Sequence, residues 1–154
     1  MVSGVFSIPL NRHAPGSRSK GGSSAQLPLS QYIGDQQNLL VRSAFESLLE
    51  HPPRYSPVTL FGRSGTGKTM LARGVAGIFR HEKRRSRIIC TTGADFAREV
   101  ALSVQTDSVD EFRQKVRRAT LLVIDDLEEM GDKLPAQEEL TRSLDALVQR
   151  ERSV

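Results

Sequence analysis

The stretch from Gly62 to Thr69, Gly-Arg-Ser-Gly-Thr-Gly-Lys-Thr, constrains the fold of this chain more than any other part. Its two outer glycines are separated by four residues and followed by Lys and Thr, which is the spacing of a phosphate-binding loop. Such a loop lies between a strand and a helix. The apolar run 58–61 predicts the strand, and helical spacing of Leu71, Val75 and Ile78 predicts the helix.

The residue types in this loop suit a chain of phosphates. Glycines let the main chain turn tightly and approach the ligand, and the N–H groups at the start of the helix donate to it. Lys68 would reach the β- and γ-phosphates, and the hydroxyl of Thr69 would bind Mg²⁺. The nucleotide-binding residues expected here are Gly62, Gly65, Thr66, Gly67, Lys68, Thr69 and Met70.

A pair of acids follows another apolar run, Leu121 to Ile124. Asp125 ends this predicted strand, where it could hold Mg²⁺ through water together with Thr69. Asp126, one step on, could orient an attacking water, so both acids are candidate catalytic residues. The alternative is a plain strand end followed by a helix cap.

Strands and helices alternate along the rest of the chain. The predicted strands cover 58–62, 87–92 and 119–126, and this alternation predicts a parallel α/β sheet flanked by helices. The loops that follow the strands would then meet at one edge. Capping patterns at Thr92 and at Ser108 would open two of the helices. Cys90 is expected to be a buried thiol, which fits a reducing cytoplasm.

The length of 154 residues allows one domain. We expect residues 1–28, rich in Gly and Ser, to form a disordered basic tail, and residues 29–154 to form the nucleotide-binding domain. The tail could make weak, salt-sensitive contacts with DNA, although a solvated tail is the simpler interpretation. No apolar run approaches the roughly 18 residues of a membrane span, so the predicted location is the cytoplasm.

Together these motifs resemble the ATPase domain of the bacterial chromosomal replication initiator, DnaA, in the AAA+ superfamily. The resemblance extends from about Tyr32 to the end of the chain and includes Gln137-Glu138-Glu139-Leu140, a signature in the helix after the acid strand. It implies a P-loop AAA+ fold that takes ATP or ADP with Mg²⁺ and acts in replication initiation at an origin. It also implies that Tyr32, Ile33 and Gly34 line the base pocket. The partners it implies are further copies of the chain, origin DNA and the replicative helicase.

The family pattern also includes parts that residues 1–154 do not match. These are a strand that separates the loop strand from the acid strand, an arginine finger, a helical lid and a DNA-binding domain. We therefore expect a sheet that is incomplete at the C-terminal side, with a gap beside the acid strand. We also expect marginal stability, with melting below about 60 °C, and weak or absent ATP hydrolysis because an arginine finger is worth roughly a thousandfold or more in rate.

Two other functions share the loop and the acid strand. A helicase-loader or transposition-helper AAA+ ATPase would remodel proteins rather than recognise an origin. A small-molecule kinase would need an arginine-rich lid, for which the sequence gives no sign. The sequence alone predicts neither a DNA sequence specificity nor an oligomeric state.

Overall fold

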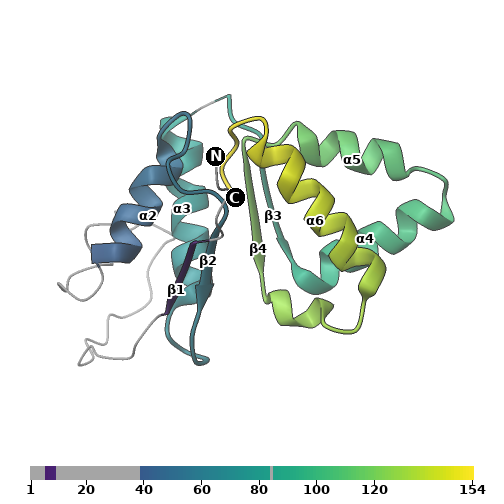
Figure 1. Ribbon diagram of the computed structural model, residues 1–154, viewed down its shortest axis with the longest axis horizontal. Coiled ribbons are helices and arrows are strands. Elements are labelled where there is room, and N and C mark those ends of the chain that lie inside the picture. The colour runs from purple at the N-terminus through teal and green to yellow at the C-terminus, as the bar shows by residue number, and fades with distance from the viewer. Residues whose placement is uncertain (1–5, 10–38, 84) are drawn as a thin grey trace.

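The computed structural model describes residues 6–9, 39–83 and 85–154, and Figure 1 shows how their helices and strands are arranged. Strands alternate with helices, as the sequence predicts. Among the described residues, no helix is long and apolar enough to cross a membrane. The elements in chain order are β1 (Phe6–Pro9), α2 (Leu39–Leu49), β2 (Val58–Phe61), α3 (Lys68–Glu82), β3 (Ile88–Thr92), α4 (Gly93–Gln105), α5 (Val109–Arg117), β4 (Leu121–Asp125), the 3₁₀ turn η2 (Leu127–Met130) and α6 (Leu134–Val148).

All the described strand pairs are parallel. β1 pairs with β2, and β3 pairs with β4 in a register that runs from Ile88 opposite Leu121 to Thr92 opposite Asp125. Parallel strands place their C-terminal ends at one edge, so the segments that follow β2 and β4 emerge on the same side. The prediction of a parallel α/β sheet flanked by helices is confirmed.

β2 and β4 are not paired with each other, and the gap expected in the sheet lies between them. Only the last residues of the described chain bridge it. Ser153 forms a parallel bridge with Leu121, and the N–H of Val58 donates to the carbonyl of Val154 at 2.8 Å. Figure 1 shows this C-terminal segment between β2 and β4.

Helices cover both faces of β4 because successive side chains of a strand point to opposite faces. Leu121 and Val123 pack with α2, α3 and β2 in one apolar cluster. Leu122 and Ile124 pack with α4, α5 and α6 in a second cluster. This second core includes an edge-to-face contact between Phe96 and Phe112, whose ring centroids lie 5.4 Å apart.

The structure differs from two sequence-based expectations, the disordered tail and the buried Cys90. β1 lies inside the segment predicted to be a disordered tail and extends the outer edge of β2, where Pro9 is tolerated because an edge strand needs fewer donors. The other residues of that segment lie outside the described part of the chain. Cys90 is in a strand but is exposed, since β3 is paired on one side only among the described residues.

The two predicted helix caps have different outcomes. The Thr92 hydroxyl accepts the Asp95 N–H at 3.1 Å, so the first cap is formed. Ser108 lies at the start of α5 but makes no side-chain cap. Its hydroxyl instead lies 2.7 Å from that of Thr106, so a hydroxyl partner two residues away competes with the helix amide for this side chain.

Candidate nucleotide-binding site

The glycine loop turns directly from β2 into α3. Gly65 and Gly67 have φ angles of 77° and 90°, a left-handed conformation that side chains with a Cβ rarely adopt. The helical hydrogen bonds begin at once, with the Leu71 N–H donating to the Gly67 carbonyl at 2.9 Å. α3 thus begins directly after the loop, and the start of a helix is where backbone N–H groups can donate to an anion.

Polar side chains of the loop hold its shape. The Lys68 ammonium donates to the carbonyls of Gly62 at 2.9 Å and Arg63 at 3.1 Å. The Thr66 hydroxyl donates to the same Arg63 carbonyl at 2.9 Å. The Lys68 ammonium is therefore folded onto the loop, and a cation beside a glycine-rich loop at a helix start favours an anion.

The acid pair lies at the end of β4, on the same edge of the sheet. Asp126 has φ 51° and ψ 52°, so the chain reverses sharply after Asp125. The Asp126 N–H donates to the Asp125 carboxylate at 3.1 Å. Gly93, at the start of α4, packs against this turn so closely that a Cβ on it would lie 2.5 Å from the Asp126 carbonyl oxygen. Asp126 is therefore held by a neighbouring backbone as well as by its own strand.

Negative charge accumulates around this turn. The pKa of Asp126 is raised, first by the charge of Asp125, then by partial loss of hydration and by the charges of Glu128 and Glu129. Lys68 acts in the opposite direction and lowers it. Carboxylates that repel one another in this way would gain from a nearby cation.

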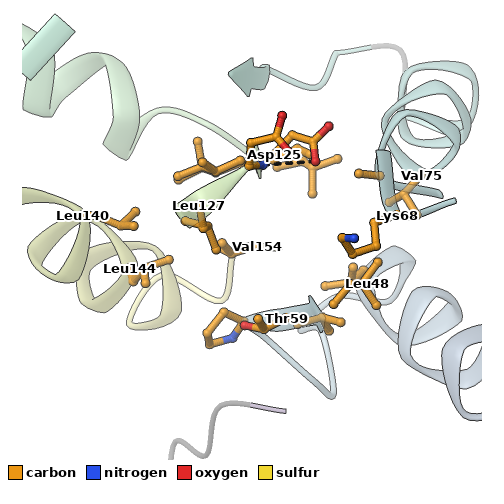
Figure 2. Close-up of a pocket in the computed structure, with 18 of the residues that line it drawn as sticks. Leu48, Thr59, Lys68, Val75, Asp125, Leu127, Leu140, Leu144 and Val154 are labelled. Atoms are coloured by element: carbon orange, nitrogen blue, oxygen red, sulfur yellow. Dashed lines mark hydrogen bonds between the residues drawn. The ribbon is translucent and has the colours of Figure 1, made fainter. Parts of the chain in front are cut away.

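Lys68, Asp125 and Asp126 line one cavity with a volume of 290 Å³. Figure 2 shows Asp125 at the upper end of this space and Lys68 at its right-hand side. The structure thus brings together the loop lysine and the acid pair that the sequence analysis singled out. Thr69 and Met70 lie in the first turn of α3. The proposed base-pocket residues Tyr32, Ile33 and Gly34 lie outside the described part of the chain.

Residues that the sequence analysis did not assign a structural role support the acid turn. The Gln137 amide donates to the carbonyls of Met130 and Gly131, each at 2.8 Å, and so ties α6 to the end of η2. The Glu129 carboxylate accepts the Ala94 N–H at the start of α4 at 3.3 Å. In the sequence analysis, Gln137 stood out only as part of the family signature, and Glu129 was not singled out.

A buried ion pair fixes α6 against α5. The Glu139 side chain is 5% exposed and accepts two bonds from Arg113, at 2.9 Å from Nε and 2.8 Å from Nη2. These bonds lower the pKa of Glu139 despite the opposing effect of burial. The pair joins α5 to α6, which is also the helix from which Gln137 reaches the acid turn.

The protein groups suit a magnesium ion that is held mainly by phosphate and water. Among the described residues, no three His, Cys, Asp or Glu side chains gather into a metal site. The sequence candidates are one carboxylate, Asp125, and one hydroxyl, Thr69. Mg²⁺ is commonly bound by one or two protein oxygens while phosphates and waters complete its octahedron.

Comparison with known proteins gives a consistent result. The family described as "Bacterial DnaA ATPAse domain" matches residues 26–154. The chromosomal replication initiator protein DnaA of Lacticaseibacillus casei is 27% identical over 125 residues, which is 80% of this chain and 28% of that protein. DnaA of Buchnera aphidicola is 29% identical over 121 residues, 77% of this chain and 26% of its own length. This chain therefore spans about a quarter of the length of these relatives.

Solved structures agree. AMPPCP-bound DnaA from Aquifex aeolicus superposes with a TM-score of 0.73 at 27% identity, covering 82% of this chain and 39% of that one. A replication initiator DnaA bound to AMPPCP and single-stranded DNA gives the same TM-score, identity and coverage. Domain III of Thermotoga maritima DnaA, at 24% identity and a TM-score of 0.74, covers 82% of this chain and 53% of that one, and it supports the fold.

Proposed function

The chain belongs to the bacterial DnaA ATPase-domain family, and from that premise we propose that it binds ATP with Mg²⁺ as a module acting in DNA replication initiation. The observation that carries this proposal is the cavity that Lys68 shares with Asp125 and Asp126. One cation, Lys68, and a carboxylate pair border the same space. A nucleoside triphosphate with its metal carries the charges that match both.

The loop would bind the phosphates through its backbone. Backbone N–H groups at the start of α3 and the positive end of the helix dipole favour negative charge there. Lys68 would exchange its bonds to the Gly62 and Arg63 carbonyls for bonds to phosphate oxygens, which are stronger because both partners are charged. Tyr32, Ile33 and Gly34 are the proposed contacts to the base.

Thr69 and Asp125 would hold Mg²⁺, which neutralises phosphate charge and offsets the repulsion within the acid pair. Asp126 is the proposed partner of the attacking water, and its conformation is fixed by Gly93 and η2. We expect slow turnover by this stretch alone. Among the described residues, Lys68 is the only cation that lines the cavity, and an arginine at the transferred phosphate is worth roughly a thousandfold or more.

The partners proposed for this chain are taken from its relatives. A DnaA structure that contains AMPPCP and single-stranded DNA supports both a nucleotide and a DNA contact for a complete protein of this family. Self-association and contact with the replicative helicase are further proposals from the family likeness. The helicase-loader alternative shares the loop and the acids, but the family match favours the initiator.

The test is a titration with a fluorescent ATP analogue, with and without Mg²⁺, on the native chain and on Asp125→Asn. We expect Mg²⁺ to tighten binding to the native chain and to have little effect on the variant, because the amide is a poorer cation ligand. Thr141→Ala, on the exposed side of α6, is the matched control and should behave like the native chain. Equal Mg²⁺ dependence in native and Asp125→Asn chains would refute the metal assignment.

A further inference from the structure

A small cavity with a volume of 200 Å³ lies at the end of the sheet where β3 and β4 begin. Figure 1 shows the C-terminal ends of α3 and α6 meeting these strand starts. Lys83 follows α3, Arg152 follows α6, and both side chains line the cavity. The Lys68 loop precedes α3, whose 15 residues are about 22 Å long. The cavity is therefore separate from the nucleotide site.

The backbone of Arg152 is fixed on both sides. Its N–H donates to the Leu147 carbonyl at 2.9 Å, and its own carbonyl accepts the Ser56 hydroxyl at 2.9 Å. The preceding residue, Glu151, has a φ of 56°, which turns the chain back after α6. The Arg152 side chain therefore borders the cavity from a backbone that is already held in place.

The Arg152 guanidinium has no acceptor in the described part of the chain, and its Nε is buried without any hydrogen-bond partner. A charged N–H group that loses water without gaining an acceptor is costly. Native structures usually supply a protein group, a water or an ion to such a donor. The cavity beside this side chain has room for that acceptor.

Lys83 also lacks an ion-pair partner among the described residues. Its ammonium lies 4.4 Å from the centroid of the buried Phe79 ring. Burial lowers the pKa of Lys83, the charge of Glu82 raises it, and the charge of Arg152 lowers it again. Two cations therefore border one cavity, and each makes the charged state of the other less favourable.

Two carboxylates border the same cavity, those of Glu50 and Glu151. Both residues are exposed, and the Glu50 carboxylate lies 3.7 Å from the Arg54 guanidinium. Within the described ranges, neither carboxylate forms an ion pair with Lys83 or Arg152. Water screens exposed charges of this kind. The two cations are therefore left without a close counter-charge.

Further cations flank the cavity. Arg85 and Arg87 lie between Lys83 and the start of β3, and both are exposed. The Arg87 carbonyl accepts the N–H of Thr120, a residue that lines the cavity, at 2.8 Å. A cluster of charges of one sign raises the local concentration of ligands with the opposite charge. This end of the sheet should therefore attract anions.

We propose that this cavity binds a phosphate group with two negative charges, either inorganic phosphate or a phosphate monoester. Lys83 and Arg152 would both donate to its oxygens, and these bonds are strong because both partners are charged. A dianion matches the two cations, whereas a carboxylate would match only one of them. The site does not depend on the proposed function, because it lies at the other end of α3 from the Lys68 loop.

The test follows the backbone amide signals of the isotopically labelled chain by NMR during titration with three probes. These are inorganic phosphate, glycerol phosphate as the monoester, and acetate at the same ionic strength as the monoanion control. We expect saturable shifts at Lys83, Thr120 and Arg152 with the two phosphates and not with acetate. The signals of Gly65 and Gly67 report phosphate at the nucleotide loop, so the two sites are read separately.

Substitutions then assign the site to its cations. Arg152→Gln and Lys83→Gln should each weaken phosphate binding at the cavity roughly tenfold or more, because a charge-assisted bond is removed. Arg150→Gln is the matched control, since it removes an exposed charge two residues from Arg152 and should change the affinity less than about twofold. Lys68→Ala should leave the shifts at the cavity unchanged. Circular dichroism shows which variants are folded.

Each outcome decides the proposal. Equal shifts with acetate and phosphate, or no saturable shift in the native chain, would show an adventitious ion only and overturn the site. Equal affinity in the native chain and in the folded Gln variants would overturn it as well. Tighter binding of glycerol phosphate supports the site with a monoester as its ligand, and tighter binding of inorganic phosphate supports it with the free ion. Shifts confined to Gly65 and Gly67 would refute this proposal and leave the nucleotide site standing.

Discussion

Replacing Gly93 by alanine tests how the acid turn is held. A Cβ at this position would lie 2.5 Å from the Asp126 carbonyl oxygen, whereas ordinary contacts begin near 3.4 Å. The two backbones must therefore separate by about 0.9 Å, and neither can yield by rotating a side chain. Overpacking of this kind costs about 1–3 kcal/mol. We expect Gly93→Ala to lower the free energy of unfolding by that amount.

Gly74 provides the matched control, since it lies within α3 and a Cβ there would meet nothing within 4 Å. Gly74→Ala should stabilise the chain by roughly 0.5–1 kcal/mol, because alanine loses less backbone entropy in a helix. Urea unfolding at constant m-value measures both changes. If Gly93→Ala proves as stable as Gly74→Ala, the close packing of α4 on the Asp126 turn is refuted.

Three further substitutions test the supporting contacts by urea unfolding. Glu139→Gln should lower the free energy of unfolding by about 2 kcal/mol at pH 7. This is less than the loss expected when a fully buried ion pair is broken, because Arg113 is partly exposed. The folded-state pKa of Glu139 is lowered, so the ion pair contributes its full stabilisation above the unfolded pKa of about 4.3, and this stabilisation is lost as pH falls through the folded pKa. A difference in unfolding free energy between Glu139→Gln and the native chain that grows below pH 4 would contradict this. Thr92→Ala should cost about 1 kcal/mol because it removes a formed cap. Ser108→Ala, which removes no cap, should stay within about 0.5 kcal/mol, and equal losses at the two sites would show that the caps are misassigned.

The sequence was most informative where one residue type is required by local geometry. The glycine spacing predicted the turn into α3, the apolar runs predicted β2, β3 and β4, and the Thr92 pattern predicted a cap. The gap beside the acid strand also followed, although from the family likeness rather than from periodicity. These features depend on neighbours a few residues away or on a shared architecture.

The sequence analysis did not predict the side-chain contacts between elements that are far apart in the sequence. Nothing near Gln137 indicates that its amide would bond the Met130 and Gly131 carbonyls. The ion pair between Arg113 and Glu139 joins α5 to α6, and the amphipathic pattern of each helix does not indicate which charged residue of the other helix it will meet. The exposure of Cys90 depends on which strands lie beside β3, and an apolar run by itself does not give strand order.

The most direct test of the central claim is the affinity of the chain for MgATP, measured by calorimetry beside Lys68→Ala. The account predicts saturable binding to the native chain and a loss of affinity of roughly tenfold or more in the variant, because a charge-assisted bond to phosphate is removed. The variant must keep its native circular dichroism for the comparison to count. Equal affinity in the two folded proteins, or no binding to the native chain, would contradict the assignment of the Lys68 loop as a nucleotide site.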